Sequence, residues 1–331
     1  MENYKYIQDK LNNGKMVILD GANGSELEKR GAQMDGAGWC GPASITHPKI
    51  LEDIHKDYIT AGAEVITTNT FSSARHVLEY STFTDQTVAI NEKAMECAVS
   101  ARNHFPDRKV AIAGSLSLSL VADIADGIND PAEFRDNMKL AQKTREVTEF
   151  TEESIREGSL NYNKILKNFN EQISIFKKYN IDLIILEMII NPSICKPAID
   201  AALASGLPVW LGLSCGDESE EGDLFAFENS KMKFSETLTT INTNFDAVLL
   251  MHSETKNITK GLQEIKGKWN GHLGAYPHKG TYVRPNWNFD KNYTPEMYSK
   301  DMQGWVDQGV RIIGSCCGMG PEYTYELKRR F

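Results

Sequence analysis

The feature that most constrains the fold is a short apolar run followed by a stretch of helical periodicity, a pattern that recurs eight times along the chain. Repeated strand-then-helix units build a parallel sheet, and eight of them can close it into a barrel. The predicted strands lie at 16–20, 64–68, 109–113, 183–187, 209–213, 247–251, 272–275 and 311–314. We therefore predict an α/β fold of the (β/α)8 TIM-barrel type.

Helical periodicity fills segments between these strands, at 48–61, 85–105, 162–179, 192–205, 231–242 and 295–308. One connection, about 118–161, is longer than a single crossover needs and is rich in charged residues. We expect it to be a helical insertion at the barrel rim after the third strand. Barrels of roughly 250 residues or more fold as one unit. Residues 1–331 are therefore expected to form a single domain.

Composition and charge exclude several classes of function. The formal net charge is −9, and no dense stripe of lysine and arginine with interleaved aromatic residues is present, which argues against a nucleic-acid partner. No apolar run approaches the ~18 to 20 residues that a membrane span requires, and the first residues lack the apolar core of a signal peptide. We expect a cytoplasmic protein without a membrane partner, whose six cysteines are thiols or metal ligands.

Polar residues follow directly on most of the predicted strands. They occur in the segments 20–24, 67–71, 114–117, 187–188, 214–217, 252–254 and 315–318. The carboxyl ends of barrel strands meet on one face, and this face carries the active site in barrel enzymes. One site assembled from distant parts of the sequence is therefore expected.

The most specific motif is a pair of adjacent thiols, Cys316 and Cys317, flanked by Gly314-Ser315 and Gly318. Adjacent side chains on a regular strand point to opposite faces, so both can reach one ion only where the strand ends and the backbone turns. The glycines allow that turn. Thiolates suit Zn²⁺, which keeps one of its four tetrahedral positions open in catalytic sites. We predict a zinc site here, with a chance pair of buried thiols as the alternative.

A third protein ligand has to come from another strand end. His252, after the sixth predicted strand, and Cys215, after the fifth, are both chemically adequate. Each also has an ordinary structural interpretation, since a single histidine often serves as a hydrogen-bonding residue and a single cysteine as a small buried apolar group. Spacing alone does not decide between them.

Taken in order, these motifs resemble the zinc-dependent homocysteine S-methyltransferases, a family that includes enzymes using betaine and S-methylmethionine. The likeness runs along most of the chain, and the double cysteine is its most specific part. It rests on Leu19-Asp20-Gly21-Ala22-Asn23-Gly24-Ser25-Glu26-Leu27, His47-Pro48, Ala61-Gly62-Ala63, Thr67-Thr68-Asn69-Thr70-Phe71, Glu187 and Gly314-Ser315-Cys316-Cys317-Gly318.

The resemblance implies a zinc ion held by Cys316, Cys317 and a residue at the end of the sixth strand, with the homocysteine sulfur in the open position. The family usually has Asn-Cys at that strand end, whereas this chain has Met251-His252. His252 thus becomes the expected third ligand, and Cys215 the alternative. Two thiolates and a neutral imidazole balance the charge of Zn²⁺, so such a site would still acidify a bound thiol.

Asp20 and Glu187 match the acidic positions of the family, which by resemblance bind the homocysteine amino group. Two carboxylates at strand ends would also attract an ammonium group on electrostatic grounds. A turn role for Asp20 and an ion pair with a helix for Glu187 are the ordinary alternatives. Asn69, Thr70 and Ser115 lie on the same predicted face and are candidates for binding a substrate carboxylate.

Trp39 falls where betaine-using members have a tryptophan against the methylated cation, and a cation over an aromatic face is a stabilising contact. Ser72 and Met188 replace further aromatic residues of those members, so the cage is expected to be incomplete. A sulfonium donor, S-methylmethionine or dimethylsulfoniopropionate, is therefore as compatible with the sequence as glycine betaine. Further aromatic walls could come from residues near the seventh strand, namely Tyr276, Tyr282 and Trp287.

The expected function is methyl transfer from a sulfonium or quaternary ammonium donor to homocysteine, giving methionine, with Zn²⁺ as the cofactor and small molecules as substrates. It requires no catalytic residue beyond the zinc site. A zinc hydrolase on a barrel is the alternative among enzymes, although such sites favour histidine and aspartate ligands that activate water. A non-catalytic barrel that binds zinc or a ligand is the alternative outside catalysis. The sequence is compatible with a homo-oligomer but does not specify one.

Overall fold

The computed structural model describes residues 2–79, 81–118, 162–283 and 286–331. Eight parallel strands form one sheet in the order β1-β13-β10-β9-β5-β4-β3-β2. The sheet closes into a barrel, because Leu19 after β1 bridges Val65 of β2 and the Asp20 amide donates to the Val65 carbonyl at 2.9 Å. The strands are β1 (Val17–Ile18), β2 (Val65–Thr67), β3 (Ala111–Ser117), β4 (Leu183–Ile189), β5 (Val209–Leu213), β9 (Ala247–Glu254), β10 (His272–His278) and β13 (Ile312–Ile313).

The predicted α/β barrel is confirmed, and each of the eight predicted strands overlaps the observed one at its place in the order. The predicted insertion at about 118–161 lies outside the described residues, apart from Leu118. Five of the predicted helices are present, as α4, α6, α9, α10 and α13.

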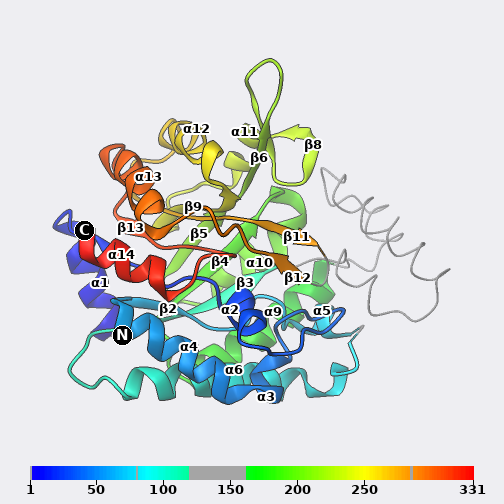
Figure 1. The fold of residues 1–331 in the computed structure, drawn as a ribbon. Helices are drawn as coiled ribbons and strands as arrows, with labels where there is room; N and C mark the ends of the chain where they lie inside the picture. Colours follow the sequence, from blue (N-terminus) through cyan, green and yellow to red (C-terminus); the bar gives the residue numbers. More distant parts are fainter. Residues whose placement is uncertain (1, 80, 119–161, 284–285) are drawn as a thin grey trace.

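Helices surround the sheet and cover its outer face (Figure 1). They are α2 (Asn23–Lys29), α3 (Ala43–Thr46), α4 (Pro48–Ala61), α5 (Arg75–Leu78), α6 (Thr87–Asn103), α9 (Tyr162–Lys178), α10 (Pro192–Ala204), α11 (Phe234–Thr237), α12 (Thr255–Lys266), α13 (Pro295–Asp307) and α14 (Pro321–Arg330), with short 3-10 helices η1 (Thr84–Gln86) and η3 (Leu238–Thr240). Within the described ranges, no helix combines the length and the apolar character needed to cross a membrane.

Side chains alternate along the strands between two apolar layers. In β4, Leu183 and Ile185 belong to the cluster inside the barrel, whereas Ile184 and Leu186 pack against the outer helices. This follows from the two-residue period of a strand, and it explains why strands covered on both sides are apolar throughout.

Helix α1 (Glu2–Asn12) closes the amino-terminal end of the barrel. Its buried residues Tyr4, Ile7 and Leu11 lie on one face at helical spacing and join the cluster inside the barrel. The indole nitrogen of Trp210, in β5, donates to the hydroxyl of Tyr4 at 3.3 Å. The opposite, carboxyl-terminal end of the barrel is the one that remains for a site.

The prediction of a helix at 231–242 is wrong. The chain there forms β8 (Asn229–Lys233), which joins β6 (Cys215–Glu218) and β7 (Leu224–Ala226) in an antiparallel sheet beside β9 and α12. Only the short α11 and η3 follow. In β8 the exposed Lys231 and Lys233 flank the buried Met232, which is the alternation of a half-buried strand.

Candidate metal and substrate site

A cavity of about 870 Å³ opens at the carboxyl-terminal end of the barrel. Residues at or just after the ends of all eight strands contribute to its lining, together with the β6–β8 sheet and the hairpin of β11 (Thr281–Val283) and β12 (Asn286–Asn288). Its volume is within the ~300 to 1,000 Å³ usual for small-molecule sites. The sequence predicted a site on this face of the barrel.

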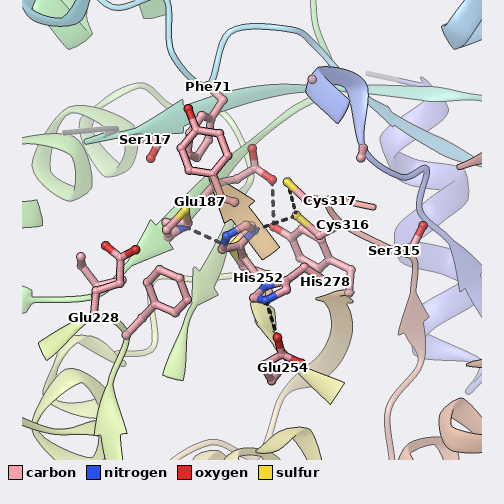
Figure 2. A pocket seen from close by; sticks show the side chains of 18 of the residues that line it. Phe71, Ser117, Glu187, Glu228, His252, Glu254, His278, Ser315, Cys316 and Cys317 are labelled. Atoms are coloured by element: carbon pink, nitrogen blue, oxygen red, sulfur yellow. Dashed lines mark hydrogen bonds and ion pairs between the residues drawn. The ribbon is translucent and has the colours of Figure 1, made fainter. Parts of the chain in front are cut away.

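Three side chains with metal-binding atoms converge in this cavity. One ligand atom each of His252, Cys316 and Cys317 lies within 4.8 Å of the others. The His252 Nδ1 atom is 3.3 Å from Cys316 Sγ, and the two Sγ atoms are 3.9 Å apart (Figure 2). Two sulfurs bound tetrahedrally to zinc at ~2.3 Å would be about 3.8 Å apart, so the observed spacing fits a zinc ion.

A β-bulge directs His252 into the cavity. The sequence predicts that His252 comes just after its strand. Strand β9 instead runs to Glu254, so His252 lies within the strand. Met251 pairs with Tyr276 and Glu254 with His278, which leaves one extra residue in β9. The φ of +40° at His252 marks the irregularity. Bulges occur next to functional sites, where they redirect a side chain.

A tight turn brings the adjacent cysteines together. The amide of Cys316 donates to the Pro277 carbonyl at 2.8 Å, and the Lys279 amide donates to the Cys317 carbonyl at 3.0 Å. Gly318 has a φ of +83°, and a Cβ there would lie 1.9 Å from the Lys279 oxygen. Only glycine fits this position, as the flanking glycines of the motif suggested.

The charges of the three residues are compatible with metal binding. Burial, followed by the nearby His278, lowers the pKa of His252 well below its usual value, so the imidazole is neutral, the form that binds a metal. The hydrogen bond with Cys316 and burial raise the pKa of Cys317. A divalent cation is the kind of charge that would stabilise thiolates in this position.

Cys215 is not part of this group. Its side chain is buried, and its sulfur lies toward α12, where it is 3.4 Å from the position that a Cβ on Gly261 would occupy. Burial raises the pKa of this thiol to about 12. Among the residues that the structure describes, His252 is thus the one that lies beside the paired cysteines.

Glu187 lies at a second bulge, in β4. Leu186 pairs with Leu211 and Ile189 with Leu213, so one residue is again extra, and Met188 has a φ of +54°. The displaced segment places the Glu187 carboxylate in the cavity lining.

Two hydroxyl groups hold the Glu187 carboxylate. Ser115 Oγ donates to Oε2, and the Tyr276 hydroxyl donates to Oε1 at 3.2 Å. Burial raises the pKa of Glu187. The carboxylate therefore has fixed orientation and limited solvation, and a cation bound there would be strongly attracted.

Asp20 is the second buried carboxylate of the cavity. It accepts hydrogen bonds from the Thr67 amide at 2.7 Å and the Thr67 hydroxyl at 2.9 Å. Burial raises its pKa well above the usual value, and the charge of Glu187 adds to the rise. Both carboxylates line the same cavity, so it has two acidic groups for a bound cation.

Asn69, Thr70 and Ser115, which were predicted to bind a substrate carboxylate, do not present free polar groups to the cavity as a set. Asn69 lines the cavity, but its amide nitrogen donates to the Cys40 carbonyl at 2.9 Å. Thr70 and Ser115 are fully buried behind the cavity wall, where Thr70 Oγ1 donates to the Ser115 carbonyl at 2.8 Å. Ser115 thus contacts Glu187 and not the cavity.

Aromatic rings form a continuous wall from Trp39 to the metal-binding group. Trp39, with a φ of +44°, packs on Gly24, where a Cβ would lie 2.4 Å from the indole ring. Its ring centroid is 6.0 Å from that of Tyr282, which is 6.2 Å from Trp287. Trp287 is in turn 6.0 Å from the His252 ring.

Sequence reasoning missed His278, Glu254 and Phe227. The His278 ring lies 4.4 Å from that of His252, and its Nε2 is 3.3 Å from a Glu254 oxygen (Figure 2). The ring centroid of Phe227 lies 5.3 Å from that of His252. Tyr276 and His278 are two residues apart in the sequence, a spacing that could have placed both on the inner face of a longer seventh strand.

Comparisons with known sequences find related methyltransferases. The family described as homocysteine S-methyltransferase matches residues 17–331. Betaine–homocysteine S-methyltransferase 1 of Pongo abelii is 26% identical, over 96% of this chain and 72% of that protein. Homocysteine S-methyltransferase 2 of Arabidopsis thaliana is 22% identical, over 96% of this chain and 93% of that protein.

Among solved structures, the metallated form of the homocysteine methyltransferase MmuM from Escherichia coli matches with a TM-score of 0.70. The superposition covers 98% of this chain and 99% of the Escherichia coli chain. The sequence identity is 18%, so this likeness concerns the fold. The family match, in contrast, extends over nearly the whole chain and includes the double-cysteine motif. The chain is a methyltransferase and belongs to the homocysteine S-methyltransferase family.

Proposed function

We propose that this enzyme transfers a methyl group from a sulfonium or quaternary ammonium donor to homocysteine, with Zn²⁺ bound by His252, Cys316 and Cys317. The convergence of these three ligand atoms within 4.8 Å in the cavity is the observation that carries the proposal. Three protein ligands leave one tetrahedral position for a substrate, which is the pattern of catalytic zinc sites. Two thiols and an imidazole form a donor set that zinc prefers.

Zn²⁺ bound at this position would lower the pKa of a substrate thiol, so that a thiolate exists at neutral pH. The residues of the chain would bind and orient the substrates. Glu187 and Asp20 would bind the homocysteine ammonium group, which would offset the cost of burying two carboxylates. Ser115 is then a positioning residue, since it holds Glu187.

The aromatic wall supports an onium donor. Trp39, Tyr282 and Trp287 present rings to the cavity, and aromatic faces stabilise a methylated cation while excluding water. A donor held against this wall would have its methyl group directed at the acceptor sulfur, and such alignment is a major part of the rate enhancement in displacement reactions. Glycine betaine, S-methylmethionine and dimethylsulfoniopropionate all have the required onium group.

We also propose that residues 1–331 form one domain, because the described parts share a single closed sheet. The segment at about 118–161 would be an insertion in that domain. A cytoplasmic location, where thiols stay reduced, would suit the paired cysteines.

A donor panel tests the proposed reaction. Zinc-loaded enzyme and homocysteine would be incubated with each of the three donors, and methionine would be measured by mass spectrometry. We expect methionine with at least one donor. Glycine betaine and dimethylsulfoniopropionate should give one methionine per demethylated donor, and S-methylmethionine two methionines per turnover, because its demethylated product is itself methionine. A lack of methionine with every donor would exclude the reaction, and zinc-dependent hydrolysis of an amide panel would then favour the hydrolase alternative.

Replacement of Glu187 by glutamine should weaken homocysteine binding about 10-fold or more, because a buried ion pair loses its charge. The same variant should change the KM for 3-mercaptopropionate by less than about 2-fold, since this thiol acid has no ammonium group. Glu254→Gln is the matched control and should leave the ratio of the two KM values unchanged. Equal losses for both thiols in Glu187→Gln would show that Glu187 has another role.

A further inference from the structure

The β7–β8 hairpin places an aromatic residue over the metal-binding group. Ala226 pairs with Asn229, so Phe227 and Glu228 form a two-residue turn, in which Glu228 has a φ of +54°. The β6–β8 sheet packs against β9 and α12, which fixes the position of this turn. Both turn residues line the cavity.

The ring of Phe227 lies on one side of the histidines, and Trp287 contacts them as well. Phe227 is 5.3 Å from the His252 ring and 6.4 Å from the His278 ring, in edge-to-face geometry. Trp287 is 6.0 Å and 5.6 Å from the same two rings. A donor that brings its methyl group to a sulfur beside His252 would therefore come within reach of Phe227.

The charge of the cavity lining favours a cation at this position. The described lining residues include no lysine or arginine, whereas the carboxylate of Glu228 follows Phe227 in the turn (Figure 2). An anionic group would therefore find no permanently charged cation among them. A cation, in contrast, is attracted to the negative face of an aromatic ring.

We infer that Phe227 forms part of the binding site for the onium group of the methyl donor and makes that site selective for a positively charged group over a neutral one of the same shape. This inference rests on the proposed function, because the ligand is the donor of that reaction. Phe227 would supply an aromatic face that Ser72 and Met188 cannot provide.

Direct binding of two ligands of equal shape tests this inference. Choline and 3,3-dimethylbutan-1-ol differ in one atom, a charged nitrogen in place of a carbon, and calorimetric titration would measure both with zinc-loaded enzyme, with and without homocysteine. The wild type should prefer choline. Phe227→Leu should weaken choline binding roughly 5-fold, the size of one cation–π contact, and should change binding of the alcohol less than about 2-fold.

Two further variants separate the aromatic face from loss of volume. Phe227→Trp should restore the preference for choline. Phe105→Leu removes a half-buried ring from outside the cavity lining, so this variant should behave like the wild type.

Equal weakening of both ligands in Phe227→Leu would overturn the inference, because the ring would then contribute shape alone. So would a wild-type enzyme without preference for choline, or one that binds neither ligand in either state. The titration does not measure methyl transfer, so its outcome is distinct from failure of the proposed reaction in the donor panel.

Discussion

Replacement of Cys316 or Cys317 by alanine should abolish zinc retention and methyl transfer while the barrel stays folded. Loss of a direct ligand should lower zinc affinity by more than the ~10 to 100-fold caused by mutation of residues that only contact the ligands. The fold should persist because both cysteines lie beyond β13, outside the paired strands that hold the barrel core. Metal analysis per protein chain, methionine formation and circular dichroism would measure the three properties.

Cys97→Ala is the matched control for these variants. Cys97 is a buried thiol on α6, remote from the cavity lining, where its sulfur donates to the Pro48 carbonyl at 3.4 Å. This variant should keep a full complement of zinc. Stoichiometric zinc in Cys316→Ala or Cys317→Ala would contradict the assignment of these cysteines as ligands.

His252→Ala should reduce zinc affinity by at least about an order of magnitude, whereas Cys215→Ser should retain zinc. His252 Nδ1 is 3.3 Å from Cys316 Sγ, but the Cys215 sulfur lies toward α12. Competition with a chromophoric chelator would give both affinities. His252→Cys should retain zinc as well, because a thiolate is also a suitable ligand at this position.

His252→Ala and Cys215→Ser also serve as controls for each other, since each removes one of the two candidates for the third ligand. A loss of zinc in Cys215→Ser, together with normal affinity in His252→Ala, would reverse the assignment. The non-catalytic alternative would be a closed zinc site in which Cys215 joins His252, Cys316 and Cys317 as a fourth ligand, and it would require both variants to lose affinity.

The sequence predicted those parts of the site that depend on local chemistry. Two adjacent thiols between glycines can face one point only in a tight turn, and the structure has that turn, with Gly318 at a φ of +83°. The order of the eight strands likewise follows from apolar runs separated by helical segments. These features need no knowledge of which residues pair across the sheet.

Features that depend on pairing could not be predicted. The bulges that direct Glu187 and His252 arise because β4 and β9 each have one residue more than a neighbouring strand, and a single sequence does not reveal this register. For the same reason Ser115, inside a longer β3 than expected, contacts Glu187 and not the cavity.

The largest error of the sequence interpretation is the helix predicted at 231–242, where the structure has part of the antiparallel sheet of β6, β7 and β8. Phe234 and Leu238 are four residues apart, a helical spacing, and they favoured a helix through 231–242. The segment before Phe234 instead pairs with β7, and this pairing positions Phe227. The pairing of a local hairpin thus overrode helical periodicity.

X-ray absorption at the zinc edge is the most direct test of a catalytic zinc site formed by His252, Cys316 and Cys317. Without substrate, the spectrum should show two sulfur ligands at ~2.3 Å and one imidazole nitrogen. Homocysteine should add a third sulfur at a similar distance, and the same sample should form methionine once an effective donor is supplied. A zinc ion with four protein ligands, or a spectrum that homocysteine leaves unchanged, would contradict the proposed site.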